Sequence, residues 1–495
     1  MPNIAYVCLS DLHLGAANSV LTHLDEHGNR LPGIGPMFDA LLAAVDELTA
    51  KSGTNSPPTL IIHGDLFELA LTSLEVAATT FDDFVVRAWG DAGGPLFASE
   101  AIFVPGNHDH HMWELAREHE FRDDLDAAST GVPEMRHITP MLHSHLPTDA
   151  LAPLVQVLAQ RALREAGSAI DVTFRVPYPN FGLVTPARDR AVVVTHGHYL
   201  EPMYRAMSFL HNVVTPARPP RLSTDALEAD NWAWIDFFWS TMGRSGDTDP
   251  EGAAVPVLYE MLQHETSVDS ILDRVLDDFL PRRRSPIRWI ERWALTRIGH
   301  RIAGKVIERE RMHPALLSRA ATDGLTNYLI GPVHEQLMTE VGQLPDHVDL
   351  VFGHTHKPFA RPATAAGFAS PVITHNTGGW VVDGTDPEPM KGASIVLITD
   401  ELEVVDVNVY HQGSASNLSR ASVTPINGIA GPGSEPTPLR DWLTSTGIDH
   451  TSPVWTHLAD VAATTVTQRR AQLAQRIAAG TKAVRDEPPV GPRGW

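Results

Sequence analysis

Cysteine is almost absent from this sequence. The chain of 495 residues contains one, Cys8, so no disulfide can form within it. Cys8 belongs to the first apolar run, where a small thiol is expected to pack as a buried hydrophobe rather than act as a nucleophile. A chain without disulfides suits a reducing compartment, and we therefore expect a cytoplasmic protein.

Positive charge and long apolar runs are also scarce. Lysine and arginine number 38 against 60 aspartates and glutamates, which gives a formal net charge of −22. A nucleic-acid-binding protein normally presents a basic face, so this excess of acid argues against nucleic acid as a partner. No run approaches the ~20 apolar residues that a membrane-spanning helix needs. The first strand is expected to begin at Ile4 with no basic or long apolar segment before it, which predicts no signal peptide.

The sequence does contain five short clusters of polar side chains, each following an apolar run rich in β-branched residues. The clusters are Asp11–His13, Gly64–Glu68, Gly106–Asp109, His196–His198 and Gly353–His356. The runs before them are residues 4–9, 60–62, 102–104, 192–194 and 348–352. Such runs are typical of buried parallel strands, and ligands at the carboxyl ends of neighbouring parallel strands converge on one crevice.

The residue types in these clusters favour metal binding. Two aspartates, one asparagine and at least four histidines, without a thiolate, suit divalent ions such as Mn, Fe, Zn, Co or Ni. We expect two such ions, with Mn as the first choice. Asp65 lies in the middle of the set and can bridge two ions, which at about 3.5–4 Å apart clamp an in-line displacement at phosphorus. One buried histidine or one Gly-Asp turn is more often structural, but five ordered clusters at strand ends are hard to explain in that way.

The ordered motifs DxH, GDxxE, GNHD, H and GHxH resemble those of the calcineurin-like metallophosphoesterase superfamily. They extend from Asp11 to His356. The resemblance implies two sets of metal ligands that share one aspartate. One metal is expected to take Asp11, His13, Asp65 and His356, and the other is expected to take Asp65, Asn107, His196 and His354.

The resemblance also assigns catalytic residues. His108 matches the catalytic histidine of the superfamily, and Glu68 falls where an acidic partner for that histidine is found. Asp109 is grouped with them as the residue that holds the turn carrying His108. Substrate contacts are expected from three residues near the motifs: His198, Lys357 and Arg361. His198 is ambiguous because the first histidine of its motif is the usual ligand, and the two basic residues could equally be solvated loop charges.

The order of the expected elements predicts an α/β fold. Helices at 36–51 and 73–89 separate the first three ligand strands, and this β-α-β-α-β order favours a right-handed parallel core. Further strands are expected at 172–176 and 181–184 as a pair, and at 372–374, 380–382, 394–399 and 402–410 as a meander forming a second sheet. The superfamily resemblance implies a layered β-sandwich flanked by helices. We expect residues 1–200 and 346–412 to form this catalytic core.

Residues 201–345 interrupt this alternation, and we expect a helical insertion or cap there. Arginines recur with apolar residues at helical spacing over 282–309. A basic amphipathic helix with tryptophan is typical of a membrane-surface contact, here through residues 232–310, and would make the protein membrane-associated. The alternatives are a helix packed on the catalytic domain and an oligomerisation helix. Residues 413–495 are expected to form a linker, a helix over 453–479 and a flexible tail.

Three features give a weaker resemblance to UDP-2,3-diacylglucosamine hydrolases. They are the Asn376–Trp380 turn, the Gly64–Glu68 motif, and an insertion between the fourth and fifth motifs, where that family carries a lipid-binding cap. The chain departs from the family because His108 stands where those enzymes typically carry arginine, and because its insertion is longer. Arginine cannot give up a proton whereas histidine can, so the substrate class stays open.

The expected function is metal-dependent hydrolysis of a P–O bond by a hydroxide that bridges the two metals. The substrate is expected to be a phosphodiester, phosphomonoester or pyrophosphate, belonging to a phosphorylated small molecule or a lipid head group. Two alternatives come from the same superfamily. One is a nuclease, which the acidic charge disfavours. The other is a catalytically inactive scaffold, which would be expected to have lost His108 or a ligand.

Overall fold

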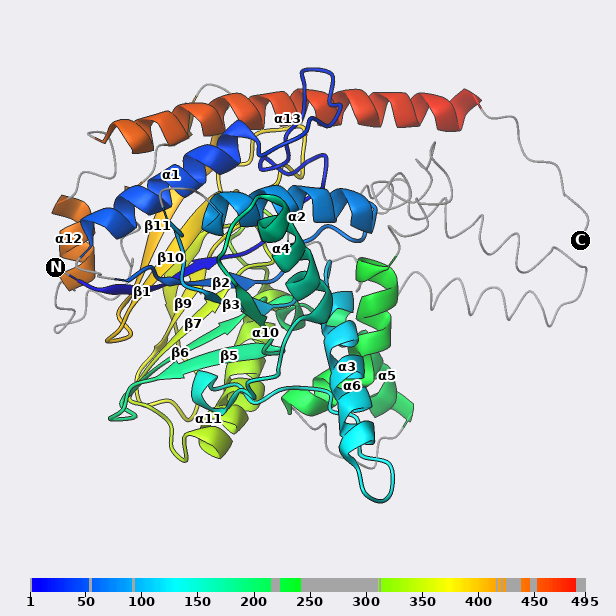
Figure 1. Ribbon diagram of the computed structural model, residues 1–495, viewed down its shortest axis with the longest axis vertical. Helices are drawn as coiled ribbons and strands as arrows, with labels where there is room; N and C mark the ends of the chain where they lie inside the picture. Colours follow the sequence, from blue (N-terminus) through cyan, green and yellow to red (C-terminus); the bar gives the residue numbers. More distant parts are fainter. Residues whose placement is uncertain are drawn as a thin grey trace, which may run out of the picture.

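A computed structural model describes residues 2–52, 56–90, 94–214, 223–241, 310, 313–414, 417–419, 422–423, 438–445 and 452–486. These residues form an α/β fold with two mixed β-sheets (Figure 1). The expected basic amphipathic stretch at 282–309 lies outside the described residues.

The strands divide between the two sheets. The first has the order β12 (Asn417–Ser419), β11 (Val404–Ser414), β10 (Gly392–Thr399), β1 (Ile4–Leu9), β2 (Thr59–His63), β3 (Glu100–Val104) and β4 (Thr173–Arg175), with β13 (Ser422–Val423) paired to β11. The second has the order β5 (Asn180–Val184), β6 (Arg190–Thr195), β7 (His347–Phe352), β9 (Val372–Asn376) and β8 (Phe359–Ala363). Strands β1 to β4 are parallel, as are β6, β7 and β9.

The expected parallel strands are present, but they do not share one sheet. Strands β6 and β7, which lead to His196 and His354, pair with each other in the second sheet rather than with β1, β2 and β3. The expected strand pair before His196 is also wrong, because β4 pairs with β3 and only β5 pairs with β6. Each sheet therefore delivers part of the candidate ligand set.

The predicted meander is wrong as well. Strand β9 joins the second sheet, whereas β10 pairs antiparallel with β1 and β11 pairs antiparallel with β10, so both extend the first sheet. The segment expected as a strand at 380–382 makes an isolated bridge between Val381 and Ser19 instead. Apolar runs predict strands, but the partner of each strand depends on contacts far apart in the sequence.

The helices flank the sheets. They are α1 (Pro36–Lys51), α2 (Leu74–Trp89), α3 (His111–Ala127), α4 (Pro153–Glu165), α5 (Ala206–Val214), α6 (Thr224–Ile235), α10 (Arg319–Tyr328), α11 (His334–Glu340), α12 (Pro438–Ser445) and α13 (Pro453–Asp486). The two helices expected between the ligand strands are confirmed. Pro36 occupies the first turn of α1, and the Ser73 side chain caps α2 by accepting a hydrogen bond from the Val76 amide.

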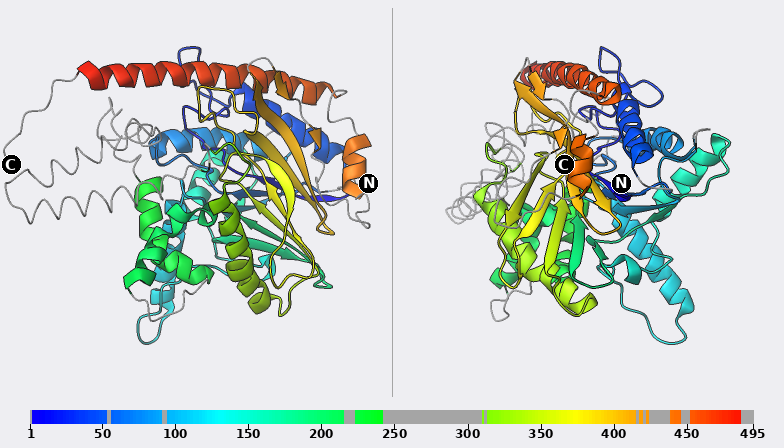
Figure 2. Two further views of the ribbon diagram at one scale, coloured as in Figure 1. Left: turned by 180° about the vertical axis from the view of Figure 1, so that it is seen from behind. Right: turned by 90° about the vertical axis from the view of Figure 1, so that its left-hand side faces the viewer.

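Figure 2 shows helices on the outer sides of the two sheets, and three apolar cores hold these elements together. Apolar side chains of α1, α2, α4 and α13 cover the outer face of the first sheet. Those of α6, α10 and α11 cover the second sheet. The third core lies between the sheets, where Cys8, Ile61 and Ile102 meet Val192 and Val351. Cys8 is thus fully buried, as expected.

Every described element between residues 201 and 345 is helical. Short helical turns, η3 (Pro202–Arg205), η4 (Asp236–Ser240) and η7 (Leu329–Val333), connect or extend α5, α6, α10 and α11. Among the described residues, no helix combines the length and the apolar character needed to cross a bilayer.

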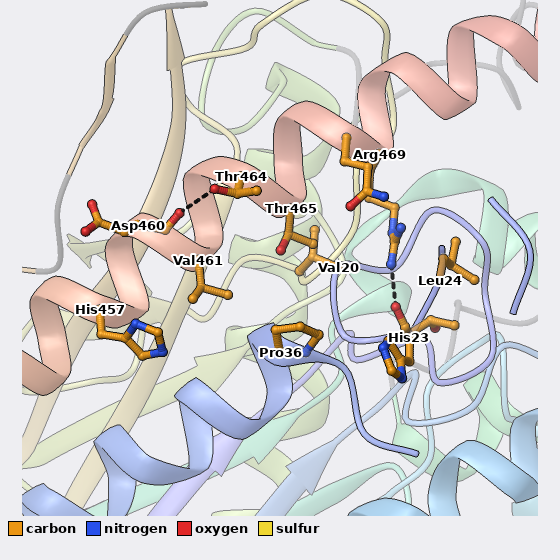
Figure 3. Close-up of a pocket in the computed structure, with 12 residues that line it drawn as sticks. Val20, His23, Leu24, Pro36, His457, Asp460, Val461, Thr464, Thr465 and Arg469 are labelled. Carbon is orange, nitrogen blue, oxygen red and sulfur yellow. Dashed lines mark hydrogen bonds between the residues drawn. The ribbon is translucent and has the colours of Figure 1, made fainter. Parts of the chain in front are cut away.

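The C-terminal helix α13 begins at Pro453, as expected, and packs along α1. Arg469 fixes it to the loop before α1 by donating hydrogen bonds to the carbonyls of Ser19 and Thr22. A cavity of about 320 Å³ lies between this helix, Pro36 and residues 20–24 (Figure 3). None of the residues that line it belongs to the predicted site, so the candidate chemistry lies elsewhere.

Candidate metal centre

The loops after five strands bring the seven predicted metal ligands together. Asp11 and His13 follow β1, Asp65 follows β2 and Asn107 follows β3, all in the first sheet. The remaining three, His196, His354 and His356, follow β6 and β7 in the second sheet. All seven side chains are buried, with at most 2% of their surface exposed.

Five of these residues have an unusual backbone conformation. The φ angles of Asp11, His13, Asp65, His354 and His356 lie between 45° and 69°. In the described part of the chain, only Arg188 and Leu402 share this feature among residues other than glycine. A side-chain-bearing residue in this left-handed region carries strain of about 1–3 kcal/mol, and such strain concentrates at functional sites.

Glycines within the motifs allow the loops to approach one another. A Cβ atom at Gly353 would lie 2.2 Å from Asp11 Oδ2, and one at Gly106 would lie 2.3 Å from Asp65 Oδ1. Both distances are far below a van der Waals contact. The backbone of each loop therefore packs directly against a carboxylate of another loop, which only glycine permits.

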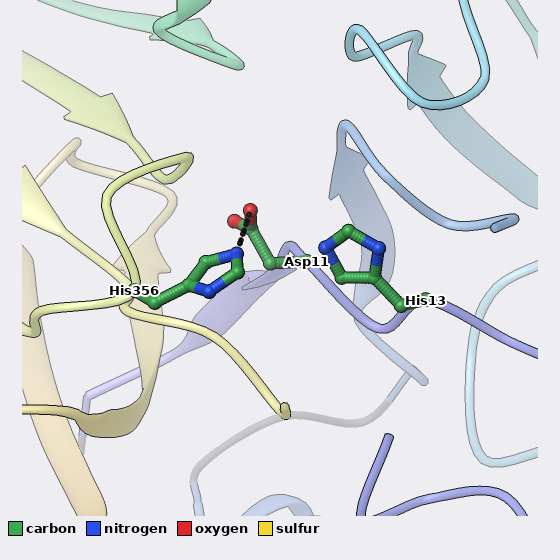
Figure 4. Close-up of side chains that lie close together, drawn as sticks. All are labelled: Asp11, His13 and His356. Atoms are coloured by element: carbon green, nitrogen blue, oxygen red, sulfur yellow. Dashed lines mark ion pairs between the residues drawn. The ribbon is translucent and has the colours of Figure 1, made fainter. Parts of the chain in front are cut away.

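Asp11, His13 and His356 form the first group (Figure 4), and their ligand atoms all lie within 4.8 Å of one another. Asp11 Oδ1 is 3.3 Å from His356 Nε2. The Nδ1 atom of His356 is 2.7 Å from Asp383 Oδ2, and that of His13 is 2.8 Å from Glu68 Oε2. An ionised carboxylate can only accept a hydrogen bond, so each Nδ1 carries the proton and each Nε2 presents a lone pair.

The second group contains Asp65, His196 and His354, together with Asn107. His196 Nε2 lies 3.4 Å from Asp65 Oδ2, 3.0 Å from Asn107 Oδ1 and 3.2 Å from His354 Nδ1. Its other nitrogen, Nδ1, is 3.2 Å from the carbonyl oxygen of His63 and donates to it. Two ligand atoms at about 2.1 Å from one ion are roughly 3–4 Å apart, which is the spacing found here.

One oxygen of Asp65 belongs to both groups. Its Oδ2 atom is 3.6 Å from Nε2 of His13 in the first group and 3.4 Å from Nε2 of His196 in the second. The other oxygen, Oδ1, accepts a hydrogen bond of 2.8 Å from the amide of His108. Asp65 therefore lies between the two groups and contacts both.

The electrostatics of the cluster favour positive charge. Burial alone raises the pKa of Asp11, but the hydrogen bond with His356 and the charge of His196 lower it to about 2. Burial acts on Asp65 in the same way, and the charges of His196 and His108 lower its pKa well below the usual value. Burial lowers the pKa of His196, whereas Asp65 and Asp11 raise it to about 9. Both carboxylates thus stay ionised at neutral pH.

His108 and Glu68 lie beside the first group. Glu68 Oε1 is 2.8 Å from Nδ1 of His108, while its other oxygen binds His13. Burial raises the pKa of Glu68, but His108 and His13 lower it to about 2. The ionised Glu68 fixes the Nδ1–H tautomer of His108, so Nε2 is the nitrogen that can exchange a proton. The contact between Glu68 and His13 was not foreseen in the sequence.

Asp109 acts on backbone groups. Its carboxylate accepts hydrogen bonds from the amides of Asp65, Leu66, Phe67 and Gly106, at 2.7–3.3 Å. Burial and the charge of Asp65 raise the pKa of Asp109 to about 7. These bonds join the loop after β2 to the loop after β3, which is the holding role expected for Asp109. Asp109 therefore supports the loops that carry Asp65 and Asn107.

The three residues expected to contact substrate have different environments. His198 is buried, with its ring tilted against that of His196 and stacked on that of Tyr178, at centroid distances of 5.6 and 6.5 Å. Lys357 is also buried, and its ammonium donates to the carbonyls of Glu310, His313 and Ala315 at 2.6–2.9 Å. These bonds use all three of its protons, so Lys357 fixes a backbone segment rather than presenting a charge at the mouth of the site.

Arg361, the third of these residues, lies on β8. Its guanidinium carbon is 5.0 Å from the centroid of the Phe359 ring, a cation–π arrangement on the same strand. Burial lowers the pKa of Arg361, and its side chain is partly exposed.

Two carboxylates at the site were missed in the sequence. Asp383 holds His356, and Glu201 Oε1 lies 2.8 Å from Nε2 of His354. Glu201 follows the His196–His198 motif by three residues, so an acidic residue just beyond a ligand motif was the available signal. Asp383 is 27 residues from His356, and no local spacing pointed to it.

Several buried groups of histidine, aspartate and glutamate could thus hold metal ions. No protein-family model matches the chain, and a search of curated proteins gives no match.

Proposed function

We propose that this protein is a metal-dependent phosphoesterase of the calcineurin-like metallophosphoesterase type. It hydrolyses a P–O bond in a phosphodiester, phosphomonoester or pyrophosphate. The observation that carries the proposal is the convergence of the ordered motif residues on one buried point, with an oxygen of Asp65 between two ligand groups. The two facing sheets with helices on both outer sides are compatible with this superfamily's layered sandwich.

The donor atoms fit two divalent ions. Carboxylate oxygens, an amide oxygen and imidazole nitrogens, without a thiolate, suit divalent ions such as Mn, Fe, Zn, Co and Ni, and we take Mn as the first choice. Two ions bound there would supply a nucleophile from water and neutralise charge on the phosphoryl oxygens. The protein's own contribution is to fix the ligands: Glu68, Asp383 and the His63 carbonyl each hold the remote nitrogen of one ligand histidine.

His108 is the proton donor to the leaving oxygen. Glu68 holds its Nδ1 proton, and the Asp65 carboxylate accepts the hydrogen bond of its backbone amide, so the ring is fixed beside the ligand groups. Its centroid is 4.8 Å from that of His13. General acid catalysis by a positioned histidine contributes typically about 10²–10⁴-fold to the rate.

Aromatic residues from the helical segment border this site. The Tyr204 ring lies 5.1 Å from that of His354, and the Trp239 ring lies 6.2 Å from that of His108. Tyr204 and Trp239 also contact each other, with centroids 5.5 Å apart. Residues between β6 and β7 therefore supply a wall of the site, where the phosphorylated small molecule or lipid head group would bind.

The test is a hydrolysis screen with metal-reconstituted protein. Nitrophenyl monoester, nitrophenyl diester, nucleotide-sugar and cyclic-nucleotide substrates are compared for wild type, His108→Ala and the control His119→Ala, whose side chain is 45% exposed on α3. We expect turnover by wild type and the control, and a loss of about 10²–10⁴-fold for His108→Ala at unchanged metal content. Undiminished turnover by His108→Ala on every substrate would remove its role, and no metal-dependent turnover by wild type on any phosphoester would refute the function.

A further inference from the structure

A separate cluster of buried charged groups lies between α3 and α6. It contains His110, Glu114 and Glu228, whose ligand atoms lie within 4.8 Å of one another. At most 5% of each residue is exposed, and none of them belongs to the seven candidate ligands described above. Asp236, on the turn after α6, borders the same histidine.

Glu228 fixes the orientation of His110. Its Oε1 atom is 2.9 Å from His110 Nε2, and its Oε2 atom accepts hydrogen bonds from the hydroxyls of Tyr178 and Tyr199. A carboxylate that already accepts two hydroxyl bonds also accepts the Nε2 proton, so Nδ1 is the nitrogen open to a proton or a metal ion. This carboxylate–histidine arrangement is the one that orients metal-binding histidines in proteins.

The Nδ1 atom of His110 faces two further carboxylates without bonding to either. It is 4.0 Å from Glu114 Oε1 and 3.9 Å from Asp236 Oδ1. Both His110 Nδ1 and Glu114 Oε1 are buried and lack a hydrogen-bond partner, because Arg117 binds the other oxygen of Glu114. Because about 4 Å is too long for a hydrogen bond, a proton on Nδ1 would leave Glu114 Oε1 unbonded, whereas a cation between the three atoms could pair with all of them.

The charge balance points the same way. The cluster holds three carboxylates, those of Glu114, Glu228 and Asp236, against the guanidinium of Arg117. Burial lowers the pKa of His110, but these carboxylates raise it to about 10, so the cluster attracts a proton or a metal cation to this histidine. A buried excess of negative charge is costly unless a cation offsets it.

We propose that His110 Nδ1, Glu114 Oε1 and Asp236 Oδ1 bind a third divalent cation of the Zn²⁺ or Co²⁺ class, with Glu228 orienting His110. Mixed imidazole and carboxylate donors suit these ions. Around a tetrahedral ion with bonds of about 2.0–2.1 Å, ligand atoms are roughly 3.3 Å apart, so the two contacts of His110 Nδ1 need to shorten by about half an ångström. His111 helps to orient the Asp236 carboxylate, because its Nδ1 is 3.3 Å from the same Oδ1 atom.

The ion would tie the helical segment to the candidate active site. His110 follows His108 by two residues, and α3 begins at His111. On the other side, Asp236 begins the turn that carries Trp239, whose ring lies near that of His108. Binding at this third site therefore sets the position of the aromatic wall relative to the proton donor, which is a positioning role.

Anomalous diffraction from crystals of the full chain with Co²⁺ tests the proposal directly. Data above and below the cobalt absorption edge should show a peak between α3 and α6, about 2.0–2.2 Å from the three ligand atoms. This position is resolved from the seven-ligand centre, so the two proposals can fail independently. A map without a peak there, or with a water in its place, would overturn the third site.

Metal binding in solution gives a second test. Chelator-treated wild type, His110→Gln, Glu114→Gln and the control His119→Gln are dialysed against Co²⁺, and bound cobalt per folded chain is measured. We expect His110→Gln and Glu114→Gln to bind one equivalent less than wild type, and the control to match wild type. Equal binding by all four proteins contradicts the site. If a variant does not fold, Asp236→Asn replaces it, with the same expected loss.

Discussion

Two groups of side chains in this molecule combine buried histidine with aspartate, yet their chemistry differs. One is the candidate metal centre. The other is His375 on β9, which lies between Asp349 of β7 and Asp406 of β11 and thereby links the two sheets. His375 Nδ1 is 2.5 Å from Asp406 Oδ2, and its Nε2 is 3.0 Å from Asp349 Oδ1. Both ring nitrogens therefore meet a carboxylate.

The two clusters differ in how donors match acceptors. A protonated His375 donates one hydrogen bond to each aspartate, and although burial lowers its pKa, Asp406 and Asp349 raise it to about 10. This cluster is complete without a metal. At the metal centre, His196 Nε2 faces both Asn107 Oδ1 and Asp65 Oδ2 and can offer at most one proton, so acceptors outnumber donors. Both places combine buried histidine with aspartate, so it is the pairing of donors with acceptors that separates a structural cluster from a candidate binding site.

The largest expected effect is that of Asp65→Asn. The amide loses the charge that both ligand groups share, so we expect loss of both metals, measured by metal analysis of purified protein. Turnover should fall by at least about 10²–10³-fold, the loss typical of removing one preorganised charge-stabilising group. Asp123→Asn, at a side chain 59% exposed, is the control and should retain metal and turnover. Full metal content in Asp65→Asn would mean that Asp65 has a structural role, as Asp349 and Asp406 have beside His375, and does not bind metal.

His375→Gln should have the opposite profile. The variant leaves two buried carboxylates facing a neutral amide, and breaking a buried ion pair in this way destabilises a protein by about 3–5 kcal/mol. Urea unfolding measures this loss, and metal content should remain that of wild type. His347→Gln, at an exposed position on β7, should change stability by no more than about 0.5 kcal/mol. Loss of metal by folded His375→Gln would show that the two clusters are coupled.

The same histidine predicts a pH dependence. Its pKa is about 10 in the folded chain and about 6.5 when unfolded, so its contribution to stability is complete below about pH 6.5. That contribution is lost as the pH rises from there through 10. We therefore expect the difference in unfolding free energy between wild type and His375→Gln to shrink between pH 7 and pH 10. A constant difference over this range would mean that His375 is neutral in the folded protein.

Much of this arrangement could be predicted from local sequence. Apolar runs followed by polar clusters located the ligand strands, because burial and strand period are properties of neighbouring residues. The α1 helix was predicted at its observed bounds, since Pro36 and an apolar stripe mark it. The assignment of strands to sheets could not be predicted in this way. Ile4 pairs with Thr399, and nothing near either residue specifies the other.

Long-range contacts also explain the side chains that the sequence misplaced. Lys357 follows a ligand motif and has the charge to bind phosphate, but its buried ammonium is held by three carbonyls, including that of Glu310. Asp383 and Glu201 hold ligand histidines, although neither stands in a motif. A side chain's residue type gives its chemistry, whereas its partners follow from the fold.

The smallest effect is expected for Asp383→Asn. Asp383 binds Nδ1 of His356 as Asp406 binds Nδ1 of His375, so the two aspartates have the same local chemistry. Removing a carboxylate that orients a metal-binding histidine typically weakens metal affinity by 10–100-fold. We therefore expect a weakening of about that size, measured by metal titration of chelator-treated protein, and mainly in the ion held by Asp11, His13 and His356.

The neighbouring Asp386→Asn is a matched control, because this residue is exposed and three positions away. It should leave metal affinity unchanged. Lys391, which lies 3.2 Å from Asp383, keeps Glu388 at 3.5 Å as a second partner, so the fold should tolerate the change. The equivalent substitution Asp406→Asn should lower stability without altering metal affinity. If Asp383→Asn lowers stability and leaves metal affinity unchanged, then His356 is a structural histidine like His375. The proposed first metal would then be assigned one ligand fewer.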